Sequence, residues 1–243
     1  MLFQGQNGKC IILSERELLM TLFKRQEILE ERLSGITLYH GSKAGIEGRI
    51  APISRSRCDF GKGFYMGTDA AQPLTLICNY PDACLYTLKA DLSGLKVLEI
   101  GTNLDWALLV AYHRGRMESA KGTPLYQRIS ELSEGCDIIV GAIANDRMFV
   151  VLDRFFSGEI TEQALIHSLS ALQLGRQYTA RTQKACDQIE IREEHRLSGM
   201  DREELKRRSE ANRAEGIALA DEICRRYRRE GRYFDEILAE GEG

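Results

Sequence analysis

Two short runs carry the residue types that could do chemistry. The first, Leu38–Ser42, ends an apolar-aromatic stretch in an imidazole, a glycine and a hydroxyl. The second, Asp59–Thr68, places a lysine between two glycines and continues as Phe-Tyr-Met. Glycines at that spacing allow a tight turn, and the aromatic residues that follow favour a strand. The second run predicts an aromatic ring near the start of a strand, where a ligand could stack on it. The first run predicts an imidazole and a hydroxyl at the end of another strand.

In this order, the two runs resemble the nicotinamide-binding face of ADP-ribosyltransferases. Their His-Gly-Ser and Phe-Gly-Lys-Gly-x-Tyr motifs are close to those of the poly(ADP-ribose) polymerase catalytic domain. The chain is also similar to a bacterial family of uncharacterised domains grouped with those enzymes, which shares Ile-Ala-Asn-Asp-Arg-Met and a later Gln-Tyr strand. This similarity covers about Thr37–Ile191. It implies an α+β fold with a split, mostly antiparallel two-sheet core, flanking helices and a cleft for NAD.

The resemblance implies roles for particular residues toward NAD, the co-substrate. His40 would bind a ribose hydroxyl, while Gly41 and Ser42 would hold the nicotinamide carboxamide. Tyr65 would stack on the nicotinamide, so that imidazole and phenol ring enclose the leaving group between them. Tyr80 is a candidate for the other face of that ring, with a core tyrosine before a turn as the equal alternative.

The glycine-lysine-glycine turn offers weaker candidates. Lys62 can meet a pyrophosphate or only solvent, and Gly63 is a candidate contact for NAD. Both Gly61 and Gly63 are better explained by the turn than by a phosphate cradle, because no helix N-terminus follows them. The sequence contains no C-x-x-C pair and spells out no metal site.

In the resembled enzymes, the third catalytic residue is a glutamate on a strand that comes later in the chain. The strand with the corresponding place along this chain begins with Gln177. An amide can bind a ribose hydroxyl but cannot act as a base. If Gln177 fills the position, the acceptor must be intrinsically nucleophilic or deprotonated elsewhere, and single transfers are favoured over chain elongation. The alternative is Asp146, for which a helix cap or a local salt bridge is the competing interpretation.

Short strands and helices must position these residues. Apolar runs bounded by turns predict strands at 36–40, 63–68, 84–91, 96–100, 136–141 and 177–182. Apolar periodicity and capping residues predict helices over 70–79, from Asn103 through 112, and over 123–132, 148–156 and 161–174.

Three regions are expected along the chain. Residues 1–35 form a helical extension, opened by a capping box at Ser14. Residues 36–191 form the ADP-ribosyltransferase-like domain. Residues 192–243 form a charged tail, where Ile217, Ala220, Cys224 and Tyr227 mark one stripe of an amphipathic helix. That stripe should pack on the N-terminal helix, a second copy of the chain or a partner.

Composition bounds the class of protein. With 43% hydrophobic and 28% charged residues, the chain is an ordinary globular one, and a net charge of −3 gives no overall attraction to nucleic acid. Seven scattered cysteines favour reduced thiols and a cytoplasmic protein, or one delivered into a target cell. No run is long and apolar enough for a membrane span or a signal peptide.

The first functional hypothesis is a mono-ADP-ribosyltransferase that uses NAD and an unidentified macromolecular acceptor, with a protein as the first candidate. The second is a binding module on the same fold that grips NAD or an ADP-ribosylated partner without turnover. The third is an NAD glycohydrolase. Members of the resembled bacterial group are suspected toxins or effectors, which implies that the tail could dock a neutralising partner.

Overall fold

The computed structural model describes residues 3–4, 10–11, 35–143, 146–171 and 175–240. The chain forms two compact units, Met1–Ile36 and Thr37–Gly243. In the first, β1 (Phe3–Gln4) pairs antiparallel with β2 (Cys10–Ile11). The helix expected from Ser14 lies outside the described residues.

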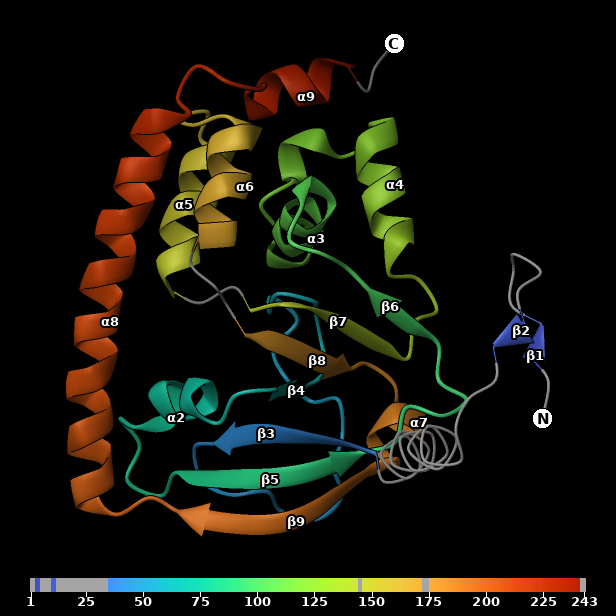
Figure 1. Cartoon of the computed structure of the whole chain (residues 1–243), viewed down its shortest axis with the longest axis vertical. Helices are drawn as coiled ribbons and strands as arrows, with labels where there is room; N and C mark the ends of the chain where they lie inside the picture. Colours follow the sequence, from blue (N-terminus) through green and yellow to red (C-terminus); the bar gives the residue numbers. More distant parts are fainter. Residues whose placement is uncertain (1–2, 5–9, 12–34, 144–145, 172–174, 241–243) are drawn as a thin grey trace. The chain divides into compact units, whose positions relative to one another are not determined.

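The second unit is built on a seven-stranded mixed sheet flanked by helices, as Figure 1 shows. The strand order is β6-β7-β8-β4-β3-β5-β9. Strands β6 and β7 are parallel, whereas β7/β8, β8/β4, β4/β3 and β5/β9 are antiparallel. The α+β class predicted from the sequence is therefore confirmed. The strands are β3 (Ile36–Ser42), β4 (Phe64–Gly67), β5 (Cys84–Ala90), β6 (Val97–Glu99), β7 (Ile138–Ala142), β8 (Arg176–Ala180) and β9 (Ile189–Arg196).

Helices flank both halves of this sheet (Figure 1). Helices α3 to α6 gather beside the β6-β7-β8 half, and α2 lies beside the β3-β5 half. The long helix α8 packs against α2, α5 and α6 and so spans the two halves. The helical elements are α2 (Ala71–Ile77), α3 (Leu104–Arg114), η1 (Glu118–Ala120), α4 (Pro124–Leu132), α5 (Asp146–Phe156), α6 (Glu162–Ala171), α7 (Gln183–Cys186), α8 (Gly199–Arg226) and α9 (Phe234–Glu240).

The helix starts follow the capping residues of the sequence. The side chain of Asn103 accepts a hydrogen bond from the Trp106 amide at 2.9 Å, and Thr123 accepts one from Tyr126 at 3.2 Å. Each bond satisfies an amide that has no partner inside the helix. Helix α3 ends at Gly115, whose φ of 73° is a left-handed conformation that glycine adopts without strain.

Strand β7 is buried on both faces, which explains its continuous apolar sequence. Ile139 belongs to one core cluster, which it shares with α3 to α6. Ile138 and Val140 belong to a second cluster with residues of β3, β4 and β5. The sheet therefore separates two hydrophobic cores.

The charged tail is continuous with this unit. Strand β9 runs through residue 192, and Arg196 still registers with Cys84 of β5. Helix α8 begins with a capping box between Ser198 and Asp201. Cys224 of α8 and Phe234 of α9 complete the first core cluster.

Three general expectations can be compared with the described part of the chain. None of its helices combines the length and apolarity needed to cross a bilayer. Within it, no group of three histidine, cysteine, aspartate or glutamate residues is placed to hold a metal ion. The thiols of the six cysteines from Cys58 onward are free.

Gly141 tests the packing of the first core. A Cβ atom on this residue would lie 2.7 Å from Phe60 and 3.2 Å from Trp106. Gly141→Ala should therefore lower the free energy of unfolding by about 1–3 kcal/mol through overpacking, measured by urea denaturation. Gly101→Ala is the matched control, because a Cβ there has no heavy atom within 4 Å. Equal stability of both variants would contradict the described core.

The buried imidazole of His113 should make the free energy of unfolding depend on pH. Burial, assisted by the nearby Arg181 charge, lowers the pKa of His113 to about 4. The unfolded chain binds the same proton near the ordinary pKa of about 6.5, so the free energy of unfolding should fall as the pH drops from 7 to 4. His113→Gln should remove up to about 3 kcal/mol of that fall at pH 4. Urea denaturation at several pH values measures it, with the exposed His195→Gln as control; parallel profiles for parent and His113→Gln would refute it.

Candidate functional site

The turn that precedes β4 is fixed by Tyr65. The Tyr65 hydroxyl donates to the Gly61 carbonyl at 2.6 Å and accepts from the Phe60 amide at 3.0 Å. Gly61 has a φ of 75°, the left-handed conformation expected of a glycine turn. Burial raises the pKa of Tyr65, so the phenol stays protonated at neutral pH. The ring is therefore anchored at its hydroxyl end, as a rigid platform requires.

Asp59 lies at the centre of the site and is 6% exposed. Its Oδ1 accepts hydrogen bonds from Nε and Nη2 of Arg114 at 2.9 and 2.5 Å. Its Oδ2 accepts from Nε2 of Gln177 at 3.0 Å. A buried carboxylate is tolerated when charge and hydrogen bonds compensate its lost hydration. Asp59 therefore ties the turn to α3 and to β8.

The side-chain amide of Gln177 is held by two acceptors. Its Nε2 donates to Asp59 and, at 3.1 Å, to the carbonyl of Ala142. Its two neighbours across the sheet are Gly67 and Gly141, which leave room for the turn to approach. Since both amide hydrogens are used, the side-chain oxygen is the group that Gln177 can offer to a ligand.

His40 is joined to β4 by its side chain. Its Nδ1 lies 2.7 Å from the Tyr65 carbonyl oxygen, and its ring stacks on Phe64 with centroids 4.2 Å apart. Burial lowers the pKa of His40, which keeps the imidazole neutral at pH 7. Because a carbonyl can only accept, Nδ1 carries the proton and Nε2 is a hydrogen-bond acceptor.

The rings of His40 and Tyr65 do not face each other. Phe64 and Tyr65 are consecutive in β4, so their side chains point to opposite faces of the sheet. The imidazole stacks on Phe64 and hence lies on the face opposite the Tyr65 ring. The expected enclosure of a ligand between these two rings is therefore not formed. The two residues meet instead through the backbone of β4.

The glycine and serine after His40 have local structural partners. A Cβ atom on Gly41 would lie 2.9 Å from Ile77 and 3.0 Å from Pro73, so α2 packs directly against this glycine. The Ser42 hydroxyl donates to the Gly45 carbonyl at 2.6 Å. Ser42 can therefore offer a ligand its oxygen lone pairs, whereas its proton is already used in the bond to Gly45.

Within the turn, Lys62 is exposed to solvent. Gly63 is required by close packing, since a Cβ atom there would lie 2.5 Å from Thr179. This supports the interpretation of Gly61 and Gly63 as turn and packing glycines.

Tyr80 and Asp146 lie at the edges of the predicted set. The ammonium of Lys43 lies 4.3 Å from the centroid of the Tyr80 ring, which places Tyr80 beside the segment that follows Ser42. Tyr80 also packs in a small cluster with Ile77. Asp146 is the first residue of α5, and its side chain lies outside the described residues.

The structure thus brings Tyr65 and Gln177 together on one sheet face around the turn and attaches His40 to the same strand from the other face. Sequence reasoning missed Asp59 and Arg114 as members of this site. Asp59 heads the glycine-lysine-glycine run, so its place in the motif could have indicated a role. Arg114 lies 55 residues away at the end of a helix, and no sequence pattern marks it.

Comparison with known proteins gives one family. No curated protein matches the chain. Among solved structures, the crystal structure of the M. tuberculosis MbcT–MbcA toxin–antitoxin complex is similar with a TM-score of 0.38 and 10% identity, over 71% of this chain and 89% of that chain. A likeness of that size supports no conclusion about function. The model of the family described as "Protein of unknown function (DUF3990)" matches residues 36–191, which include every residue of the candidate site. The chain therefore belongs to the DUF3990 family.

Proposed function

We propose that the chain binds NAD where β3 meets β4 and transfers its ADP-ribose to a macromolecular acceptor. The observation that carries this proposal is the bond between His40 and the Tyr65 carbonyl. It fixes a neutral imidazole whose Nε2 can accept a hydrogen bond from a ribose hydroxyl. The described register between the two strands holds Tyr39 opposite Gly67, directly before the His-Gly-Ser segment.

The anchored ring of Tyr65 and the oxygen of Gln177 lie on the sheet face opposite His40. In this proposal NAD reaches them by passing between β3 and β4, whose described pairing is the single position Tyr39–Gly67. Breaking the bond between nicotinamide and ribose leaves an oxocarbenium-like sugar, whose positive charge needs electrostatic support. The carboxylate of Asp59, 3.0 Å behind the Gln177 amide, polarises that amide, so that its oxygen carries more negative charge.

The proposed transfer balances without a base among these residues. The electron pair of the broken bond leaves with nicotinamide, and an acceptor nucleophile forms the new bond to the sugar. Its proton passes to solvent, because Gln177 cannot take it and Asp59 is held by Arg114. Transfer of a single ADP-ribose, rather than chain elongation, follows from this lack of a base.

A non-catalytic NAD-binding module is the second candidate, and the same amide favours it. Gln177 has no ionisable group and is fully engaged through its nitrogen. An NAD glycohydrolase is the third candidate, in which water takes the place of the acceptor. The toxin or effector role, and a neutralising partner on the tail, are proposed from sequence resemblance alone.

Labelled NAD separates these candidates. Label on a macromolecule indicates transfer, release of nicotinamide alone indicates hydrolysis, and binding without either indicates a module. His40→Ala should weaken NAD binding about tenfold, the effect of one hydrogen bond worth about 1.4 kcal/mol. His195→Ala is the matched control, since His195 is exposed on β9. Unchanged NAD affinity in His40→Ala would overturn the proposed site.

The hydrogen bond between Asp59 and Gln177 can be tested by replacing the amide with a carboxylate and the carboxylate with an amide. Gln177→Glu removes two donors and sets a second carboxylate against Asp59, so the free energy of unfolding should fall by about 2–4 kcal/mol. NAD turnover should not rise, although the resembled enzymes carry a glutamate. Adding Asp59→Asn removes the contact between two carboxylates, so Gln177→Glu should lower the free energy of unfolding less in the Asp59→Asn background than in the parent.

Urea denaturation and nicotinamide release measure the two effects, with Asp59→Asn alone as the reference for the double variant. A Gln177→Glu protein as stable as the parent and more active would show that Gln177 is not held as described.

A further inference from the structure

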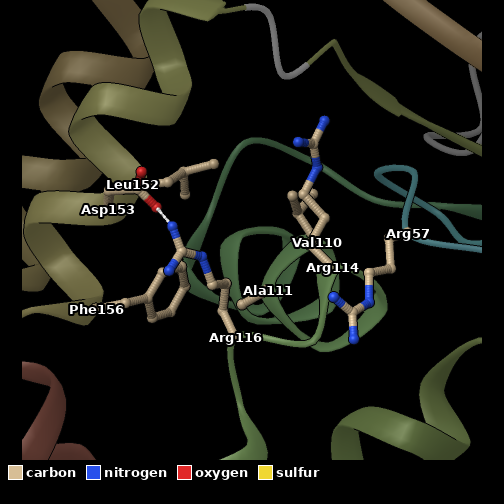
Figure 2. A pocket seen from close by; sticks show the side chains of 8 residues that line it. All are labelled: Arg57, Val110, Ala111, Arg114, Arg116, Leu152, Asp153 and Phe156. Atoms are coloured by element: carbon tan, nitrogen blue, oxygen red, sulfur yellow. Dashed lines mark hydrogen bonds and ion pairs between the residues drawn. The ribbon is translucent and has the colours of Figure 1, made fainter.

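A cavity of about 300 Å³ lies at the C-terminal end of α3, on the side that faces α5. Figure 2 shows that Arg114 and Arg116 reach it from the end of α3, Arg57 from the segment before the turn, and Asp153 from α5. Three arginine side chains thus line one small cavity together with Asp153, in a chain whose net charge is −3. Figure 2 shows the guanidinium of Arg114 pointing away from those of Arg57 and Arg116. The positive charge is local.

Two of these arginines are held in place by carboxylates. Arg114 is paired with the buried Asp59, and Arg116 is paired with Asp153, as the dashed line in Figure 2 marks. Arg57 is exposed and, among the described residues, has no ion pair or hydrogen bond. Its Nε lies 3.8 Å from the position of a Cβ on Gly115, so the side chain lies over the glycine that ends α3.

The rest of the lining is apolar. Val110, Ala111 and Leu152 are buried side chains of α3 and α5, and Phe156 adds an aromatic ring. A volume of about 300 Å³ is at the lower end of the range for small-molecule sites. The cavity can hold one phosphate with a single ring, but not a dinucleotide.

We propose that this cavity is a binding site for a small phosphate ester with an aromatic or other apolar body. The planar guanidinium fork matches the geometry of phosphate oxygens, and Arg57 is the arginine with donors to give. The apolar lining would cover the body of the ligand. Arg114 borders both this cavity and the proposed NAD site, but the proposal does not rest on NAD binding.

The probe for this proposal is phenyl phosphate, titrated into the full-length protein by calorimetry, with inorganic phosphate as the comparison. Phenyl phosphate should bind more tightly than inorganic phosphate, because only its ring contacts the apolar lining. Arg57→Ala should weaken phenyl phosphate binding about tenfold, the effect of one charge-assisted hydrogen bond. Arg57→Lys should retain part of the affinity, since it keeps the charge but loses the fork.

Arg128→Ala is the matched control, because Arg128 is an exposed arginine on α4 paired with Asp105 outside the cavity. His40→Ala should keep full phenyl phosphate affinity, so failure of the NAD proposal and failure of this one are distinguishable. The proposal is overturned if phenyl phosphate does not bind, if it binds no more tightly than inorganic phosphate, or if Arg57→Ala and Arg128→Ala behave alike.

Discussion

The buried carboxylate of Asp59 is the constraint on which the site depends. Removing a carboxylate from water costs several kcal/mol unless opposite charge and hydrogen bonds replace its hydration. Arg114 and Gln177 supply both, at 2.5–3.0 Å. The carboxylate can be satisfied only if the turn, the end of α3 and strand β8 come together. The position of Tyr65 follows, since its hydroxyl is bound to the same turn.

If Gln177 takes the place of the glutamate in the resembled enzymes, as proposed, this constraint gives the reason for the difference. A glutamate in place of Gln177 would put two carboxylates in contact in a buried site, and one of them would have to bind a proton. An amide donates to Asp59 through nitrogen and still presents an oxygen. The amide at this position is thus a requirement of the neighbouring aspartate, and the negative charge near the proposed ribose site comes from the aspartate behind it.

Local features were readable from the sequence, and long-range ones were not. The cap at Asn103 and the apolar run of β7 specify their elements through nearby residues, and the structure confirms them. The sheet face that His40 occupies depends on how β3 registers with β4, which no residue near His40 encodes. The link between Arg114 and Asp59 is a single pair across elements, so it leaves no periodic signal.

The sequence also does not show why a glycine is needed at a given position. In the sequence, a glycine beside a histidine is equally consistent with a contact to a ligand and with close packing. Only the position of α2 shows that Gly41 is in a packing contact.

Arg114 is shared between the two proposed sites, and magnitudes decide how far they are coupled. Its partner Asp59 has a side chain only 8% exposed, whereas the side chains of Arg116 and Asp153 are 56% and 51% exposed. Exposed ion pairs contribute about 0–1 kcal/mol, while removing one partner of a buried pair costs about 3–5 kcal/mol. An anion in the cavity can therefore draw Arg116 away from Asp153 at little cost but cannot draw Arg114 away from Asp59. Arg57 and Arg116 would adjust to a ligand, and Arg114 would keep the turn and Gln177 in place whether or not the cavity is filled.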